Sequence, residues 1–440
     1  METFLIKAAQ LICALSLLVI IHELGHFMWA RIFKIRVEKF YIFFNPWFSL
    51  AKWKPKKSET EWGIGWMPLG GYVKIAGMID ESMDTAQLAS EPKPWEFRSK
   101  PAWQRLLVMT GGVLNNFILA IIIYAGIAFW WGEKTIPFQN AYEGMDFTPA
   151  MQALGFRNGD ILLEADGRTL DSRERSVAFK MLEAREVTVL RNHRDTVAIR
   201  LPEGAILTIP ENDPLMAIRV PVYVKQIMPG EPAAEAGLQV GDRIIAVGDS
   251  LTPAFTELSP ALMAYKGQKT DLTIVRGNDT IRVAATPTEA GKLGFGLKTP
   301  AEIFDVEITA YNPLQAIPVG VRNGTEMLTT YVGSLKHLFT KEGAESIGGF
   351  GAIGNLFPPA WDWRTFWEMT AFLSIILAFM NIIPIPALDG GHVMFLLWEV
   401  VTRRKPSDKV LEYAQMAGMF FLIALLIYAN SNDIYRFLIK

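Results

Sequence analysis

The sequence predicts an α-helical membrane protein with four transmembrane helices, a membrane-associated β-hairpin and two inserted β-rich domains. Apolar residues make up 50% of its 440 residues, and the chain is too long for one ordinary core. Four apolar segments come close to or exceed the roughly 20 residues that a membrane-spanning helix needs. They lie at residues 4–27, 106–130, 366–385 and 410–428.

The remaining composition divides the chain into further parts. Residues 133–306 have the composition of a soluble protein, whereas the segments around them are apolar or basic. The predicted parts are a first helix (1–32), a cytoplasmic segment with the hairpin (33–103), a second helix (104–131), two β-rich domains (133–220 and 221–306), an amphipathic helix with a glycine-rich loop (313–360), a third helix (364–402) and a fourth helix (410–430).

Charge and cysteine content exclude several classes of protein. The net charge of −2 and the lack of a long basic run with interleaved aromatic residues exclude nucleic acid as a partner. The single cysteine, Cys13, lies in the first apolar segment, so any metal must be bound by histidines and carboxylates. Residues 1–21 resemble a secretory signal, but no small-residue cleavage site follows, and we expect a retained span.

The strongest chemical signal lies at the end of the first apolar segment, where residues 22–26 read HELGH. Residues four apart lie on one face of a helix, so His22 and His26 can bind one metal ion while Glu23 lies beside it. This is the zincin arrangement. Ionisable groups at membrane depth cost roughly 2.5 kcal/mol or more each, and they usually persist for function. In the alternative, structural interpretation both histidines extend toward the interface at the helix end.

A zinc ion bound by two histidines needs a third protein ligand and leaves its fourth position for water. Asp389 is the best candidate, and His392 is a rival that spacing does not exclude. Pro384 and Pro386 interrupt the apolar run before them and free backbone groups, which is tolerated at membrane depth only beside protein or water. In the same run, Asn381 either donates a hydrogen bond to the substrate or the oxyanion, or packs between helices.

The distribution of basic residues predicts the topology. Between the first two spans lie thirteen Lys and Arg residues against eight acidic residues, and the loop after the third span is basic at residues 403–405 and 409. By the positive-inside rule both segments are cytoplasmic, so both termini and the β-rich domains lie outside. The first and third spans then run in the same direction, with His22 and Asp389 roughly 27–35 Å along them, at similar depth.

Residues 61–75 alternate large and small side chains around a Pro-Leu-Gly-Gly turn, which predicts a β-hairpin or a re-entrant loop. Its tryptophans favour a position near the membrane, whereas the plainer interpretation is an ordinary surface hairpin. An open strand edge beside a protease site could accept an extended substrate by strand addition.

The soluble segment contains a repeat. GFRNGDIL at residues 155–162 recurs as GLQVGDRI at residues 237–244. A strand, a turn, a helix-like stretch and two β-rich runs follow each copy. Two β-rich modules of about 80 residues fit this pattern better than one large domain.

Three further segments carry structural signals. Residues 313–340 place apolar side chains on one helical face, which predicts a helix at the outer membrane surface or one that gates the bundle. Residues 348–354 are so rich in glycine that a loop or hinge is expected. In the second span, residues 111–116 (GGVLNN) permit close helix approach, and the asparagines can hydrogen-bond across helices.

Together, HELGH at residues 22–26, PLGGY at 68–72, the two glycine-aspartate repeats and residues 381–390 resemble the site-2 proteases. The chain is most similar to their bacterial regulator of sigma-E protease branch, which has tandem PDZ domains. The resemblance implies an intramembrane zinc metalloendopeptidase. It also implies the roles of four residues: Zn2+ bound by His22, His26 and Asp389, with Glu23 as general acid and base.

The resemblance also implies how substrate is bound and where the protein lies. In the family, the segment that contains Gly70 and Gly71 pairs with substrate, and Asn381 and Pro386 match positions that shape the substrate site. The expected substrates are single-span membrane proteins, such as a pre-trimmed anti-sigma factor or a remnant signal peptide, cleaved in regulated intramembrane proteolysis. The expected location is the bacterial inner membrane, with both termini and the PDZ-like domains on the periplasmic side.

Two other classes of function fit parts of the sequence. One is a non-proteolytic membrane scaffold whose PDZ-like domains bind peptides and whose metal is structural. The other is an ion transporter, since charged residues within spans also mark ion paths. The chain has only four predicted spans, and they show no inverted repeat, which argues against the transporter.

Overall fold

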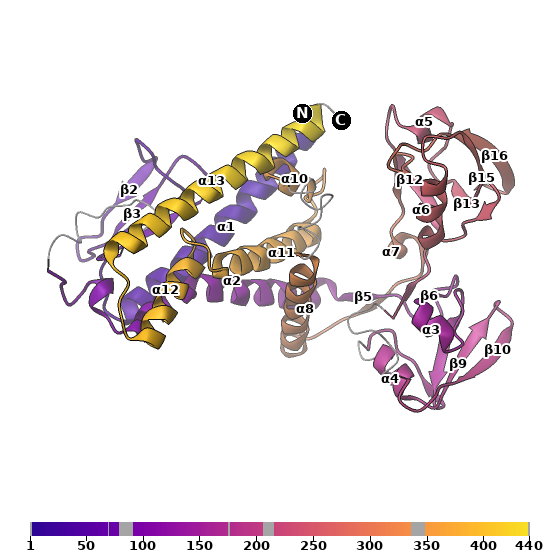
Figure 1. Ribbon diagram of the computed structural model, residues 1–440, viewed down its shortest axis with the longest axis horizontal. Helices are drawn as coiled ribbons and strands as arrows, with labels where there is room; N and C mark the ends of the chain where they lie inside the picture. The colour runs from indigo at the N-terminus through magenta and orange to yellow at the C-terminus, as the bar shows by residue number, and fades with distance from the viewer. Residues whose placement is uncertain are drawn as a thin grey trace. The chain divides into compact units, whose positions relative to one another are not determined.

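The computed structural model describes residues 2–68, 70–78, 91–174, 177–205, 215–335 and 348–438. Its contacts form two compact units, one of Met1–Gly132 with Ala310–Lys440 and the other of Glu133–Thr309 (Figure 1). The first unit contains the long apolar helices, and the second contains the β-rich modules.

Four helices of the first unit are long and apolar enough to cross a membrane, as the sequence predicted. The helices of this unit are α1 (Glu2–Ile32), α2 (Ala102–Trp131), α8 (Pro313–Ser334), α10 (Phe350–Asn355), α11 (Trp363–Ile382), α12 (Asp389–Thr402) and α13 (Asp408–Leu438), with a 3-10 turn η2 (Phe97–Ser99). The spanning ones are α1, α2, α11 and α13. Because α2 contacts α1, α8, α11 and α12, it is the central helix of the unit.

The helices α1 and α2 touch through their backbones. A Cβ atom added to Gly25 of α1 would lie 2.2 Å from the carbonyl oxygen of Gly111 in α2. One added to Gly111 would lie 2.6 Å from the Trp29 ring. Glycine is therefore required at this crossing, and the close approach expected of the second span is present.

The prediction of one continuous helix over residues 364–402 is wrong. The chain leaves the helix after Ile382 and enters a new helix at Asp389. Pro384 and Pro386 lie in the break, where a proline lacks the N–H of a helical hydrogen bond and disfavours helical geometry in the residue before it. The two prolines therefore end the helix and do not merely interrupt it.

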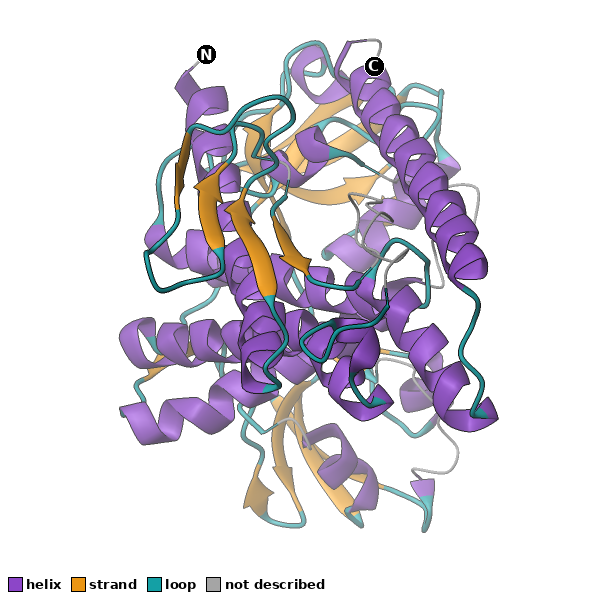
Figure 2. Ribbon diagram, turned by 90° about the vertical axis from the view of Figure 1, so that its left-hand side faces the viewer, coloured by secondary structure: helices purple, strands orange, loops and turns teal. Residues whose placement is uncertain are grey.

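The expected hairpin at residues 61–75 is also wrong, because these residues belong to a four-stranded sheet with the order β2-β3-β1-β4 (Figure 2). The strands are β1 (Val37–Ile42), β2 (Ala51–Trp53), β3 (Glu61–Ile64) and β4 (Tyr72–Ile75). Strand β3 runs parallel to β1 and β4 runs antiparallel to it, so β1 separates them. The side chains of β1 fit this central position, since Val37 and Phe40 are 0% and 2% exposed. In the described part of the chain the only strand that pairs with β4 is β1, so β4 is an edge strand of this sheet.

The second unit repeats one order of elements. The first copy contains β6 (Met145–Phe147), α3 (Pro149–Ala153), β7 (Ile161–Ala165), β8 (Arg168–Thr169), α4 (Val177–Glu183), β9 (Glu186–Arg191), β10 (Asp195–Arg200) and β11 (Met216–Ile218). The second contains β12 (Val222–Ile227), α5 (Pro232–Glu235), β13 (Arg243–Val247), β14 (Ser250–Leu251), α6 (Phe255–Ala264), β15 (Thr270–Arg276), β16 (Asp279–Ala285) and β17 (Phe295–Leu297). Outside both lie β5 (Glu133–Thr135), α7 (Pro300–Ile303) and β18 (Glu307–Thr309), and β5 pairs with β18.

The sheets are ordered β10-β9-β7-β8, with a separate β11-β6 pair, and β16-β15-β13-β12-β17, with β14 on β13. Each copy buries its own apolar core. In the first copy, Asp160 accepts hydrogen bonds from the backbone of Arg157 and from the guanidinium of Arg191. In the second, Asp242 accepts the equivalent bonds from Gln239 and Arg276. In each copy the aspartate of the motif thus links the turn before one strand (β7 or β13) to a later strand (β9 or β15).

This network predicts a pH-dependent stability. The Arg276 guanidinium, which donates to the carboxylate, holds the pKa of Asp242 below its ordinary range. Since Asp242 is 1% exposed, we expect Asp242→Asn to lower the free energy of unfolding by about 1–3 kcal/mol. The contribution is complete above the unfolded-state pKa of about 3.9, and it is lost as the pH falls through the lower folded-state pKa.

The measurement is denaturant unfolding of the full-length protein in detergent at pH 7 and at decreasing pH. Asp249→Asn is the matched control, because Asp249 is exposed in a turn of the same module. A difference between wild type and Asp242→Asn that persists unchanged below about pH 3 would contradict this role.

After residue 310 the predicted helix is present, but the predicted glycine-rich loop is wrong. Helix α8 packs on α2, with an added Cβ on Gly320 lying 2.5 Å from the Ile121 carbonyl oxygen, so one of its faces is buried in the helical unit. The glycine-rich stretch was expected to be a loop, yet it forms α10. The Asp433 carboxylate of α13 accepts from the N–H groups of Gly349 and Ala352 and so caps this helix. Residues 336–347, which include the end of the helix predicted at 313–340, lie outside the described residues.

Candidate metal centre

Helix α1 places three chemically active side chains together. His22 and His26 are 8% and 7% exposed, and their Nε2 atoms lie 3.2 Å apart. They are one turn apart on the same face, as the spacing of the motif predicted. Glu23 is partly buried beside them.

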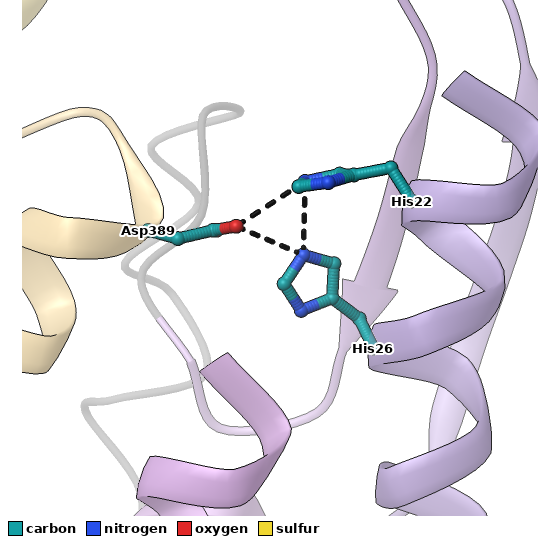
Figure 3. Close-up of side chains that lie close together, drawn as sticks. All are labelled: His22, His26 and Asp389. Atoms are coloured by element: carbon teal, nitrogen blue, oxygen red, sulfur yellow. Dashed lines mark hydrogen bonds and ion pairs between the residues drawn. The ribbon is translucent and has the colours of Figure 1, made fainter. Parts of the chain in front are cut away.

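Asp389 reaches the same point from the other end of the sequence. It is the first residue of α12, and the Oδ2 atom of its carboxylate lies 3.2 Å from Nε2 of His22 and 3.2 Å from Nε2 of His26 (Figure 3). The break after α11 makes this possible, since Gly390 and Gly391 allow the turn to fold tightly against the backbone of residues 382–386. His22 and Asp389 thus lie at similar depth, as the sequence predicted, although the chain reaches Asp389 through this break and not along one continuous helix.

These three atoms fit a zinc ion. A tetrahedral ion with bonds of about 2.0–2.1 Å separates its ligand atoms by about 3.3–3.4 Å. The three observed separations are all 3.2 Å. The donors are two imidazole nitrogens and one carboxylate oxygen, a set that zinc accepts. Among the described residues this is the one group of at least three His, Cys, Asp or Glu side chains with such spacing.

The ring of His26 is oriented by α2. Its Nδ1 lies 2.8 Å from the backbone oxygen of Val108, to which it donates. A neutral His26 that donates here carries its proton on Nδ1, which leaves the lone pair of Nε2 available to a metal ion. This carbonyl holds the ligand in the tautomer that binds a metal. No hydrogen-bond donor satisfies the buried Oδ2 of Asp389 in the described structure, which further fits a cation at this point.

The edge strand β4 begins beside Glu23. A Cβ added to Gly71 would lie 3.6 Å from Cγ of Glu23, and the backbone of Val73 hydrogen-bonds the Glu23 carboxylate. Gly70 lies instead against the ring of Phe44, 2.6 Å from an added Cβ. Of the two glycines expected at the substrate site, Gly71 is therefore the one next to the predicted general base.

The remaining candidates separate into two groups. Asn381, in the last turn of α11, has its Nδ2 atom 3.3 Å from Nε2 of His22, so it belongs to the centre. Pro386 lies in the turn before α12, against Gly418 of α13. His392 is outside the triangle, with its Nε2 atom 2.7 Å from Nε2 of Gln415. The geometry therefore favours Asp389 over His392 as the third ligand.

Sequence reasoning missed several residues that shape the centre. Val108 acts through a backbone carbonyl, which no side-chain pattern reveals. Gly112 lies directly against both imidazoles, and Asn116 contacts the ring of His22. The glycine and asparagine pairs of the second span were noticed, but only as packing signals. Gln415 accepts a hydrogen bond from the backbone of Ala387 and thereby joins α13 to the turn before Asp389.

Two histidines and an adjacent glutamate on one helix define a zincin-type metallopeptidase, and here the helix is long enough to cross a membrane. The family model described as "Peptidase family M50" matches residues 10–425, and the chain belongs to this family, that of the site-2 proteases. The protein is thus a zinc metalloprotease embedded in a membrane.

Named relatives agree. A protein of Rickettsia conorii named as a zinc metalloprotease is 27% identical over 428 residues, which cover 96% of this chain and 97% of that one. Metalloprotease MmpA of Caulobacter vibrioides is 27% identical over 450 residues, covering 99% and 96%. Protease RseP of Yersinia pestis is 27% identical over 475 residues, covering 99% and 100%.

The contact at Gly112 gives a direct prediction. A Cβ added there would lie 2.5 Å from Nε2 of His26 and 2.6 Å from Cε1 of His22, so Gly112→Ala must displace the rings. We expect zinc affinity to fall by about 10–100-fold or more. Gly126→Ala in the same helix is the control, since nothing lies within 4 Å of its added Cβ. Wild-type zinc affinity in Gly112→Ala, measured by chelator competition, would contradict the described geometry.

Proposed function

We propose that the protein hydrolyses peptide bonds within the transmembrane segments of single-span membrane proteins. The observation that carries this proposal is the triangle of His22, His26 and Asp389. The two histidines lie in α1, and Asp389 follows the break at the end of α11; both helices are long enough to cross a membrane. A pre-trimmed anti-sigma factor or a remnant signal peptide is the proposed kind of substrate. The similarity to Protease RseP supports proteolysis as the activity, and the kind of substrate follows from the resemblance of the motifs.

In this proposal His22, His26 and Asp389 hold the zinc ion, which when bound lowers the pKa of a water ligand to about 7 and polarises a carbonyl group. Glu23 is the general base that takes the proton of the attacking water and then gives it to the leaving amine. The Nδ2 group of Asn381, which already points to the centre, donates to the oxygen on which negative charge develops.

The edge strand β4, whose Val73 backbone hydrogen-bonds Glu23, is the proposed place for the substrate. A helical substrate keeps its carbonyl groups hydrogen-bonded and shielded, so the scissile region must first unwind. An extended segment could then pair with β4 next to Gly71, whose missing side chain leaves room near Glu23. Each glycine in the substrate helix lowers the cost of unwinding by about 1 kcal/mol relative to alanine.

We also propose a location and a role for the second unit. The basic residues between the first two spans support a cytoplasmic position for that segment, with both termini and the second unit in the periplasm of a bacterial inner membrane. Its two modules share an order of strands and helices that fits PDZ-like domains. They would exclude substrates that still carry bulky outer domains.

The test is cleavage of a purified single-span substrate in detergent and in vesicles. We expect hydrolysis inside the span, located by mass spectrometry, which stops with a zinc chelator and returns when zinc is added. A substrate with two glycines near the cut should be cleaved faster than one with alanines. Tight substrate binding without any turnover would instead support the membrane scaffold with a structural metal.

A further inference from the structure

We infer that Asn116 is a positioning residue that holds the ring of His22 in its metal-binding tautomer. Asn116 lies in α2 and is 0% exposed. Its side-chain amide is 3.4 Å from Nδ1 of His22. Its backbone oxygen accepts a hydrogen bond of 2.8 Å from Ser374 of α11, so the residue is held between two spanning helices. The inference rests on the proposed role of His22 as a zinc ligand.

The orientation of the amide is assigned from the ring that it faces. With Nδ2 toward the ring, the buried Oδ1 of Asn116 has no partner among the described residues, and the Nδ1 proton of a zinc-binding His22 has no acceptor. The two ends of an amide are nearly equal in size, and the hydrogen-bond network decides which end faces a neighbour. We therefore assign Oδ1 to the position facing Nδ1 of His22, where it accepts the Nδ1 proton.

The proposed metal centre itself requires this tautomer. Nε2 of His22 lies 3.2 Å from Nε2 of His26 and 3.2 Å from Oδ2 of Asp389, so Nε2 is the atom that would bind zinc. The proton of the neutral ring must then be on Nδ1, which requires an acceptor there. Asn116 is the described residue whose side chain lies at that position.

The two histidines are thus held by one face of α2. Val108, Gly112 and Asn116 follow each other at intervals of four residues, so they lie along one side of the helix. Val108 accepts from His26, Gly112 makes room for both rings, and Asn116 accepts from His22. Without Asn116 the His22 proton can move to Nε2, which lies 3.2 Å from Asp389, and that proton would occupy the position of the metal.

The test measures zinc affinity of the full-length protein in detergent by competition with a chelator. Asn116→Leu keeps the size of the side chain and removes the acceptor, and we expect zinc affinity to fall about 10–100-fold. Asn116→Asp keeps an acceptor oxygen and should restore affinity to within about threefold of wild type. Asn115→Leu is the matched control, because the neighbouring Asn115 donates to the backbone of Ile21 and not to a ring.

A second measurement does not depend on a bound metal or on a variant that folds. The nitrogen NMR spectrum of histidine-labelled, zinc-free protein distinguishes a protonated Nδ1 from a protonated Nε2. We expect Nδ1 protonation at His22 in wild type and in Asn116→Asp, and mixed tautomers in Asn116→Leu. A wild-type spectrum with the proton on Nε2 would overturn the inference even if Asn116→Leu does not fold.

A further arm separates this inference from the proposed function. His22→Ala should lose zinc if His22 is a ligand. Zinc retained at wild-type affinity in His22→Ala would overturn the ligand assignment itself. Zinc lost in His22→Ala but bound with wild-type affinity by folded Asn116→Leu would overturn only the role of Asn116, as would Asn116→Asp binding no better than Asn116→Leu.

Discussion

Replacing Glu23 by glutamine is expected to abolish proteolysis while zinc stays bound at about one equivalent per chain. Glu23 lies beside the two histidines, but its carboxylate does not belong to the triangle of candidate ligand atoms. Glutamine has nearly the same size and cannot accept a proton at neutral pH. The rate of cleavage should fall by about 10²- to 10⁴-fold, the usual contribution of a general base.

The measurement combines metal analysis with cleavage of a single-span substrate by the same preparation. Glu2→Gln makes the same chemical change at an exposed position in the first turn of the same helix, and should leave both values unchanged. Cleavage at the wild-type rate by Glu23→Gln would refute the catalytic assignment. Loss of zinc in that variant would show that Glu23 is instead a ligand.

Asp389→Ala is expected to lose zinc, whereas His392→Ala is expected to retain it. The Asp389 carboxylate lies 3.2 Å from both imidazole nitrogens, and removing it leaves only two protein ligands. The loss of affinity should exceed the roughly 10–100-fold that follows removal of a residue behind a ligand. His392 contacts Gln415 and lies outside the triangle, so its replacement should leave zinc affinity near that of wild type.

Both variants should be compared by zinc content after dialysis against a weak chelator, with thermal unfolding of the zinc-free forms as a check on folding. Asp389→Glu and Asp389→Asn add a graded test, since both keep an oxygen at or near the site. A protein that keeps zinc in Asp389→Ala and loses it in His392→Ala would reverse the choice between the two candidates.

The sequence predicted the parts of the structure that depend on local patterns. Four spans follow from apolar length, and the structure has four such helices. The positions of His22 and His26 follow from helical spacing alone, because residues four apart share a face. The repeat at residues 155–162 and 237–244 likewise reappears as a repeated order of elements.

Parts that depend on long-range pairing could not be predicted in this way. Strands β3 and β4 are close in the sequence, yet each pairs with β1, and nothing in the local pattern of residues 61–75 distinguishes this from a hairpin. The glycine-rich stretch forms α10 because Asp433 caps it from another helix. These hydrogen bonds from α13 stabilise a helix that the glycine-rich sequence favours only weakly by itself.

The candidate centre also combines features that local sequence patterns predict with features that depend on long-range packing. Asp389 is a candidate from the sequence because an acid that follows two prolines in an apolar run needs a partner, but only the geometry distinguishes it from His392. The residues that orient the rings were harder still. The contacts of the Val108 carbonyl and of Asn116 with the histidine rings depend on how α2 packs against α1, which the sequence does not show.

The central claim is that α1 and α12 together hold one zinc ion, and diffraction at the zinc absorption edge from crystals of the zinc-loaded protein tests it most directly. The account predicts a single anomalous peak within about 2.0–2.2 Å of Nε2 of His22, Nε2 of His26 and a carboxylate oxygen of Asp389. A peak elsewhere, or Asp389 turned away from a zinc ion that the two histidines hold, would contradict it.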